Sequence, residues 1–391
     1  MLNSWYNIYV MNMKKKILIA YASYGSGHKT AAQYVYDYFN KFDKYELKII
    51  DLMDYGNKIG KLSTDLFNLT FRYNQKSLFT LVYNFFNHRV VSSHIPYKTI
   101  TKAILKNKEL RRDIEEFKPD LLISPHFFPS IILGIFNSKG YTNTKIITIV
   151  TDFETHQLWT VNEKNEDAIV VSNDIMKKEL IKKGIDKNKI YPYGIPLSSK
   201  FKEVDDKVNV KNKYHVNNDL KTFLFFAGGS MGSSNSYQFF KKLLKERFDI
   251  NIIYVCGKND ELKVKAEKLV LNEKYKNVTV LGFSNDINNL LNISDVVITK
   301  PGGLSITESL EMKKPLLLIP GNGGQEDYNE RFIVKNGFGL TCKTPNSLVK
   351  NVTKLLTRPS ILDVMVKKLN KYEKNTSVEK LYKLSNKLLK K

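Results

Sequence analysis

Short apolar runs alternate along the chain with longer segments in which apolar positions recur at helical spacing. The run from Lys16 to Tyr21 is typical of a strand buried on both faces, and the stretch from Lys29 to Phe39 has the spacing of a helix. The same pattern predicts N-terminal strands at 47–51, 120–124, 145–150, 168–172 and 190–193, and helices at 110–117 and 175–183. Strands that alternate with helices favour a parallel sheet covered on both faces.

A second series of strands begins after a polar, charged segment. Residues 198–219 have no apolar periodicity, so we interpret them as an interdomain linker. Further strands are then predicted at 222–226, 251–256, 278–281, 296–299 and 315–319. The predicted fold class is therefore α/β, with two Rossmann-like doubly wound domains that face a cleft. The predicted boundaries are 14–197 for the N-terminal domain, 198–219 for the linker, 220–365 for the C-terminal domain and 366–391 for a helical tail.

The composition excludes several classes of protein. With 391 residues of which 42% are hydrophobic, the chain can bury two cores, which excludes a disordered chain. Its two cysteines, Cys256 and Cys342, are too few for a disulfide framework or a four-cysteine zinc site and fit a reducing cytoplasm. No apolar stretch reaches the roughly 20 residues of a membrane-spanning helix. The 62 basic and 39 acidic residues leave a net charge of +23, which indicates an anionic partner: nucleic acid, a lipid surface or a phosphorylated ligand.

Three glycine-rich loops follow predicted strands. They are Gly25–His28, Gly228–Gly232 and Pro301–Gly303. Glycines at the start of a helix let a ligand approach the backbone, whose N–H groups favour phosphate, although each loop taken singly could equally be a tight turn. None has the Walker pattern or the G-x-G-x-x-G fingerprint, so the sequence gives no support to a P-loop ATPase or a nicotinamide enzyme.

Two groups of polar residues follow the last of these loops. Glu308 lies about one and a half turns into the helix predicted after Gly303, where its carboxylate could accept hydrogen bonds from both hydroxyls of a ribose. Gln325 and Glu326 follow a strand and a proline, and an amide beside a carboxylate suits sugar hydroxyls. A solvent-facing helix residue and a polar surface turn are the structural alternatives.

The positive charge is concentrated in one segment. Residues 55–112 hold 11 basic residues against Asp65 and Glu109, which is +9 of the total. Aromatic residues are interleaved with these charges, among them Phe79, Phe85 and Phe86 close to Arg89. This mixture is expected of a helix that lies in the headgroup region of an anionic membrane. An ordinary helix whose aromatic residues pack into the N-terminal core is the alternative.

Several short stretches recur in this order in one enzyme family. They are Ala22–His28, Thr151–Trp159, Gly194–Pro196, Val255–Asn259, Thr299–Gly303 and Gly324–Glu326. As a set they resemble the bacterial processive diacylglycerol glucosyltransferases and the plant monogalactosyldiacylglycerol synthases, over about residues 15–345. The fold of that family is similar to that of the peptidoglycan enzyme that adds N-acetylglucosamine to lipid I. Asp152, His156, Trp159 and the Lys300–Gly303 loop separate this lipid branch from the peptidoglycan branch.

The resemblance implies a glycosyltransferase fold of the B type, with the lipid acceptor on the N-terminal domain and a UDP-sugar on the C-terminal one. It implies inversion at the anomeric carbon and no metal or other cofactor, and the sequence has no Asp-X-Asp motif. By resemblance Glu308 is the ribose ligand, the backbone near Phe283 contacts uracil, and Gln325 and Glu326 contact the donor sugar. The diphosphate is expected on Gly228, Gly229, Ser230, Lys300, Gly302 and Gly303.

The transfer needs a base near the acceptor hydroxyl. His28 can act in this way because a neutral imidazole accepts a proton near neutral pH, and Asp152 and His156 are the alternative bases. Trp159 is expected at the acceptor, with Phe79, Phe85, Phe86 and Arg89 at the membrane. The expected product is a glucosyl- or galactosyldiacylglycerol, with the donor sugar and the number of sugars added left open.

The expected partners are the UDP-sugar, diacylglycerol and anionic lipids at the cytoplasmic face of the membrane, where the protein would be peripheral, and no nucleic acid. Three other functions stay open: a peptidoglycan-type UDP-GlcNAc transferase, a UDP-sugar epimerase and a basic nucleic-acid-binding protein. The last has the charge but no RRM, zinc-finger or helix-turn-helix signature in the sequence.

Overall fold

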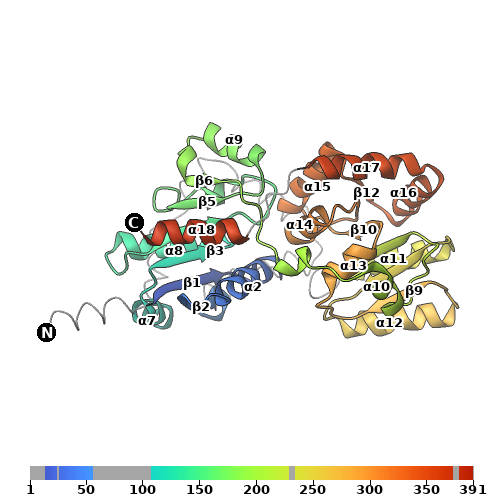
Figure 1. Ribbon diagram of the computed structural model, residues 1–391, viewed down its shortest axis with the longest axis horizontal. Helices are drawn as coiled ribbons and strands as arrows, with labels where there is room; N and C mark the ends of the chain where they lie inside the picture. Colours follow the sequence, from blue (N-terminus) through green and yellow to red (C-terminus); the bar gives the residue numbers. More distant parts are fainter. Residues whose placement is uncertain (1–13, 24–25, 56–106, 229–233, 373–377, 391) are drawn as a thin grey trace.

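The computed structural model describes residues 14–23, 26–55, 107–228, 234–372 and 378–390. Within these residues the chain forms two α/β domains that lie side by side, each around a six-stranded parallel sheet (Figure 1). The strands of the first sheet are β1 (Lys15–Tyr21), β2 (Tyr45–Asp51), β3 (Leu121–Ser124), β4 (Lys145–Ile149), β5 (Ala168–Val170) and β6 (Ile190–Tyr191). Those of the second are β7 (Thr222–Phe226), β8 (Asn251–Val255), β9 (Val278–Leu281), β10 (Val296–Thr299), β11 (Leu316–Leu318) and β12 (Gly339–Thr341).

Both sheets reverse their direction of winding beside their first strand. The orders are β2-β1-β3-β4-β5-β6 and β12-β11-β10-β7-β8-β9, so the reversals fall between β1 and β3 and between β7 and β10. At such a switch point the loops after two neighbouring strands diverge, which leaves room for a ligand at the carboxyl edge of the sheet. The doubly wound α/β fold predicted from the sequence is confirmed.

Helices cover both faces of each sheet because the strands are apolar on both sides. In β1, Ile17 and Ile19 pack into one buried cluster and Leu18 and Ala20 into the other. The N-terminal helices are α2 (Ser26–Asn40), α7 (Lys108–Phe117), α8 (Phe127–Ser138) and α9 (Asp174–Lys182). The C-terminal domain holds α11 (Ser234–Lys245), α12 (Asp260–Asn272), α13 (Ile287–Ile293), α14 (Gly303–Glu311), α15 (Gln325–Asn336) and α16 (Pro345–Thr357).

The predicted linker has more structure than its polar sequence suggested. It contains a 3₁₀ turn at Ser199–Lys202 and helix α10 (Lys207–Lys213). Phe201, Val210 and Val216 are buried in the core of the C-terminal domain, spaced too widely to produce a visible periodicity. The linker therefore belongs largely to the C-terminal domain.

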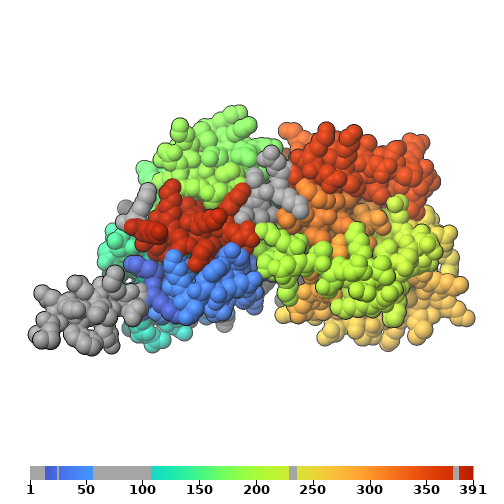
Figure 2. All heavy atoms as spheres, viewed as in Figure 1, coloured from blue at the N-terminus to red at the C-terminus, as the bar shows by residue number. Residues whose placement is uncertain are grey.

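The C-terminal tail returns to the N-terminal domain. Helix α17 (Pro359–Lys371) runs across the boundary predicted at 365/366, because its Leu362, Met365 and Leu369 are buried in the C-terminal domain. The tail proper is α18 (Val378–Leu389), which packs beside α2 in the N-terminal core (Figure 1). The space-filling view shows α18 (red) against the N-terminal segment (blue), at a distance from the rest of the C-terminal region (Figure 2). Strand β1 and helix α18, the first strand and the last helix of the described residues, thus belong to the same domain.

Candidate active site

The C-terminal switch point is formed by the loops that follow β7 and β10. Gly228 follows β7 with a φ of +99°, a left-handed conformation that suits glycine. Gly229 and Ser230, also predicted to contact the diphosphate, lie outside the described residues. After β10, Lys300-Pro301-Gly302 leads directly into α14 at Gly303. The N-terminus of α14 therefore opens at the edge of the sheet where an anion is favoured.

The two glycines of the β10 loop have different surroundings. A Cβ on Gly302 would have its nearest neighbour at 3.9 Å, the Oε1 atom of Glu326, so the protein leaves space there. A Cβ on Gly303 would collide with the carbonyl oxygen of Thr151, which belongs to the N-terminal domain. Gly302 thus faces a space that a ligand could fill, whereas Gly303 allows the two domains to approach each other.

Glu308 lies on α14 at the domain interface. It is 8% exposed, and burial raises the pKa of its carboxyl to about 8. The hydroxyl of Tyr34, on α2 of the N-terminal domain, donates a hydrogen bond of 3.3 Å to its Oε1 atom. The predicted ribose ligand is therefore in contact with the other domain, a feature the sequence did not reveal.

Glu326 organises the loop between β11 and α15. Its Oε1 atom pairs with the Nζ atom of Lys300 at 3.0 Å, and its Oε2 atom accepts a hydrogen bond of 2.6 Å from the backbone N–H of Asn322. Gln325 is the first residue of α15. The structure thus brings Lys300 and Glu326 together beside Gly302, with the lysine charge already paired, and Gln325 precedes Glu326 in the chain.

Phe283 follows β9 at the same edge of the sheet. Its side chain is 59% exposed, and the Nζ atom of Lys258 lies 5.2 Å from the centre of its ring. An exposed aromatic ring at the carboxyl edge of a sheet is available to stack against a flat ligand such as a nucleobase.

His28 lies at the N-terminal switch point, in the first turn of α2. Its Nδ1 atom is 2.9 Å from the carbonyl oxygen of Pro125, after β3, and 3.0 Å from the hydroxyl of Thr151, after β4. Because a carbonyl oxygen can only accept, Nδ1 carries the proton and Nε2 keeps its lone pair in the neutral ring. Burial lowers the pKa of His28 below its ordinary value, which favours the neutral ring. His28 is therefore oriented to accept a proton at Nε2.

His126 is a neighbour of His28 that the sequence analysis missed. The two rings meet edge to face with their centres 4.7 Å apart, and His126 is 4% exposed. Its Nδ1 atom accepts a hydrogen bond of 3.1 Å from the N–H of Phe128, and burial together with His28 lowers its pKa. The sequence feature that could have identified His126 is its position just after β3, a strand that borders the switch point. That feature can be recognised only once the strand order is known.

Asp152, His156 and Trp159 were predicted as one cluster, but in the structure they lie in different environments. Asp152 faces the C-terminal domain, where the Nδ2 atom of Asn329 donates to its Oδ1 atom at 3.1 Å; burial raises its pKa to about 6. The Nδ1 atom of His156 accepts from the N–H of Leu158 at the start of a 3₁₀ turn. Trp159 is buried, with its ring centre 6.1 Å from that of His126. Trp159 is thus on the side of His28, and Asp152 at the interface.

Phe79, Phe85, Phe86 and Arg89, the predicted membrane contacts, lie outside the described residues. In the part of the chain that the structure describes, every helix is too short or too polar to span a bilayer.

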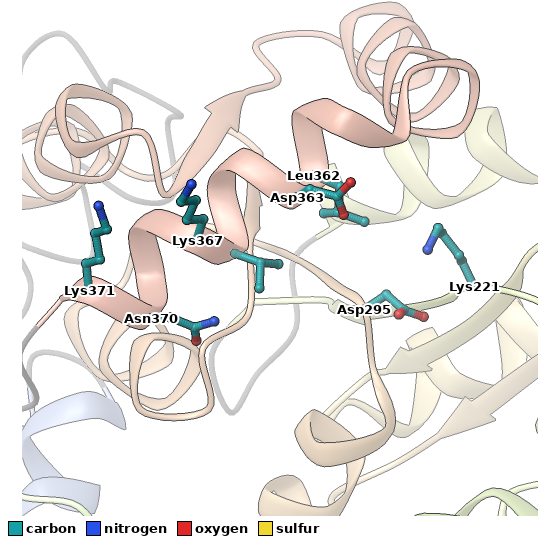
Figure 3. A pocket seen from close by; sticks show the side chains of 8 residues that line it. Lys221, Asp295, Leu362, Asp363, Lys367, Asn370 and Lys371 are labelled. Atoms are coloured by element: carbon teal, nitrogen blue, oxygen red, sulfur yellow. The ribbon is translucent and has the colours of Figure 1, made fainter.

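A separate pocket lies at the opposite edge of the C-terminal sheet. It is lined by Lys221, Asp295, Leu362, Asp363, Val366, Lys367, Asn370 and Lys371, seven of which are labelled in Figure 3. Lys221 and Asp295 immediately precede β7 and β10, so this pocket lies at the amino ends of the strands. None of its lining residues is a predicted site residue, and the candidate active site is therefore sought at the carboxyl edges.

Comparison with known proteins divides the chain into the same two halves. A family model described as monogalactosyldiacylglycerol (MGDG) synthase matches residues 28–197, and one described as glycosyltransferase family 28 C-terminal domain matches residues 223–382. The processive diacylglycerol beta-glucosyltransferase of Bacillus subtilis is 27% identical over 360 residues, which cover 92% of this chain and 91% of that protein. The enzyme of the same name from Staphylococcus haemolyticus is 28% identical over 373 residues, 95% and 92% of the two chains.

Solved structures share the fold at low sequence identity. The UDP-GlcNAc 2-epimerase of Neisseria meningitidis bound to UDP-GlcNAc superposes with a TM-score of 0.61 at 15% identity, over 96% of this chain and all of that one. MurG of Acinetobacter baumannii gives a TM-score of 0.58 at 14% identity, over 95% and 99%. At this identity the solved structures show similarity of fold alone, whereas the family models and the relatives show similarity of sequence. The chain is a glycosyltransferase whose N-terminal half is similar to the monogalactosyldiacylglycerol synthases and which, along most of its length, is similar to the processive diacylglycerol beta-glucosyltransferases.

Proposed function

We propose that this enzyme transfers a hexose from a UDP-sugar to the hydroxyl of diacylglycerol, with inversion at the anomeric carbon. One observation carries the proposal: Thr151 links the two switch points. Its hydroxyl lies 3.0 Å from Nδ1 of His28, and its carbonyl oxygen lies against Gly303 at the start of α14. The proposed base and the helix start proposed to bind phosphate thus lie on two sides of Thr151.

The donor would bind at the C-terminal switch point. The diphosphate would lie at Gly228, Gly302 and the N-terminus of α14, where backbone N–H groups balance the charge that develops as UDP leaves. Glu308 would accept hydrogen bonds from the ribose hydroxyls, with Phe283 close to the uracil and Gln325 and Glu326 at the hexose. Since backbone N–H groups and α14 balance the diphosphate charge, we expect turnover to persist in EDTA.

The acceptor would approach from the N-terminal switch point. His28 takes the proton of the diacylglycerol hydroxyl at Nε2 while the hydroxyl oxygen bonds to the anomeric carbon and the bond from that carbon to the phosphate oxygen breaks. The surroundings of the two alternative bases favour His28, because Nδ1 of His156 already accepts a backbone hydrogen bond and Asp152 is held by Asn329.

The acceptor assignment rests on the relatives that match along nearly the whole chain, which are named diacylglycerol glucosyltransferases. The test is incubation with vesicles of diacylglycerol and anionic lipid and with labelled UDP-glucose or UDP-galactose, followed by separation of the lipids. We expect label in a lipid product with one of the two donors. Label found only in free sugar or in an altered UDP-sugar would contradict the proposal and favour hydrolysis or an epimerase.

We further propose that residues 55–112 dock the enzyme on anionic lipid at the cytoplasmic face of the membrane. The attraction between the +9 charge of this segment and anionic lipid would explain the charge, with no need for a nucleic-acid partner. Changing Phe79, Phe85 and Phe86 to serine should reduce sedimentation with anionic vesicles. A matched variant with Val264, Leu271 and Val364 changed to serine, which are exposed apolar residues elsewhere, should bind as the wild type does. Equal binding of the two variants, with both folded by circular dichroism, would contradict the docking role.

A further inference from the structure

Asn329 joins the two domains through a single buried amide. The residue lies on α15 and is fully buried. Its Nδ2 atom donates to Oδ1 of Asp152 and to the carbonyl oxygen of Pro301, each at 3.1 Å, and its Oδ1 atom accepts from the N–H of Phe153 at 2.8 Å. Two of these partners belong to the N-terminal domain and the third to the predicted diphosphate loop. An amide satisfies this set because it both donates and accepts.

The segment that Asn329 binds is held from the C-terminal domain at two further points. The ring of Phe332, one turn along α15, stacks on that of Phe153 with their centres 4.6 Å apart. The carbonyl oxygen of Thr151 lies against Gly303. Residues 151–153 therefore take their position from α14 and α15 of the other domain.

The same segment orients His28. Thr151 contacts Nδ1 of the imidazole and donates a hydrogen bond of 3.4 Å to the carbonyl oxygen of Pro125, the other partner of that nitrogen. A displacement of residues 151–153 would therefore alter the direction of Nε2. Since α15 begins at Gln325 and Glu326, one helix connects the proposed sugar contacts to the proposed base.

We propose that Asn329 is a positioning residue, which fixes the Thr151–Phe153 segment against the donor loop and thereby aims the His28 imidazole at the acceptor. This inference deepens the proposed function and rests on His28 as the base. Asn329 itself touches neither substrate in this account, so its loss acts on the chemical step and leaves nucleotide binding largely intact.

The first test separates turnover from donor binding. Asn329→Ala should lower kcat by about tenfold or more while changing the Kd for UDP by less than about threefold. Asn336→Ala is the matched control, because Asn336 lies on the same helix and its amide donates within that helix, to the carbonyl oxygen of Phe332. It should change neither quantity. A kcat of Asn329→Ala within about threefold of wild type, or an equal loss of UDP affinity, would overturn the proposal.

A second variant guards against a simple loss of folding. Asn329→Asp has the same shape and keeps the acceptor for Phe153, but it places a carboxylate oxygen against Asp152 and the carbonyl oxygen of Pro301. The charged groups around this site are Asp152, Glu326 and the Lys300 that pairs with Glu326. Protonation of one carboxyl restores a donor, so the ratio of variant to wild-type kcat should rise as the pH falls. A ratio that does not change with pH would count against the pairing.

The last readout needs no acceptor. The pKa of His28 can be measured by NMR in the ligand-free protein, where His126 is the titratable group in contact with its ring. Wild type and Asn336→Ala should titrate below the ordinary value, and Asn329→Ala should titrate about half a unit or more higher, because water reaches a loosened ring. An unchanged His28 pKa in Asn329→Ala would overturn the positioning role. If wild type made no glycolipid, the proposed function would fail while this measurement would still decide the role of Asn329.

Discussion

The two switch points of the molecule present different kinds of chemical group, backbone at one and a side chain at the other. The C-terminal one is built mainly from backbone, with Gly228, Gly302 and the start of α14 grouped at the edge of one sheet. The N-terminal one is built from a side chain, His28, whose orientation depends on Pro125 and Thr151 after two other strands. The first arrangement suits a ligand with fixed charge, and the second suits a proton transfer. Changes at the two sites should therefore affect different quantities.

The largest expected effect is on the N-terminal side. His28→Asn keeps an N–H group for the Pro125 carbonyl oxygen but cannot accept a proton, so kcat should fall by about 10² to 10⁴ with the UDP Kd unchanged. His215→Asn, a change at an exposed histidine of the C-terminal domain, is the control and should be neutral. Steady-state kinetics and calorimetry on both variants measure the two quantities. Substantial turnover by His28→Asn would move the base to another residue.

Glu308→Gln should give the next largest effect, on donor binding. A hydrogen bond to a charged group contributes about 1.5 to 3 kcal/mol, so the UDP-sugar should bind about tenfold to a hundredfold more weakly. Calorimetric titration is the measurement. An unchanged affinity would remove Glu308 from the donor site.

The pH dependence of donor binding sharpens the same point. Burial raises the pKa of Glu308 to about 8, and ribose hydroxyls favour the ionised form, so binding should release a proton below that pH. The affinity for UDP-glucose should therefore rise with pH up to about 8 and then level off. In Glu308→Gln the dependence should disappear; if it persisted there, another group would be its source.

Two neighbouring glycines should respond differently to alanine. Gly302→Ala should leave the unfolding temperature unchanged and weaken UDP binding, because its Cβ occupies the space left for the diphosphate. Gly303→Ala should lower the free energy of unfolding by about 1 to 3 kcal/mol, because its Cβ meets the backbone of Thr151. Thermal unfolding and calorimetry distinguish the two. If Gly302→Ala and Gly303→Ala changed the unfolding temperature and the UDP affinity equally, Gly302 would have a role in domain contact like that of Gly303 and none specific to the diphosphate.

Tyr34→Phe should have the smallest effect. The Tyr34 hydroxyl lowers the pKa of Glu308 by donating to its carboxylate, so its removal should raise that pKa and weaken UDP-glucose binding a few-fold near pH 7. Above the pKa the two proteins should bind alike. A weaker affinity at every pH would instead assign Tyr34 a direct contact with the nucleotide.

The two sites also differ in how far the sequence predicted them. Strands and glycine loops were recognisable because apolar runs and glycines are local signals, and the family resemblance assigned Gly302, Glu308 and Gln325 to one donor site. The network around His28 could not be recognised from the sequence. Pro125, Thr151 and Asn329 come from separate elements, and their contacts depend on the strand order and on how closely the two domains approach each other. A polar linker with three dispersed apolar residues likewise gave no periodic signal.

The central claim is inverting transfer of a hexose from a UDP-sugar to a lipid hydroxyl, and the configuration of the product tests it most directly. UDP-hexoses carry the nucleotide in the α configuration, so a single displacement gives a β-linked sugar. Proton NMR of the purified glycolipid should show the large coupling of a β anomeric proton. An α-linked lipid, or sugar released without a lipid product, would contradict the account.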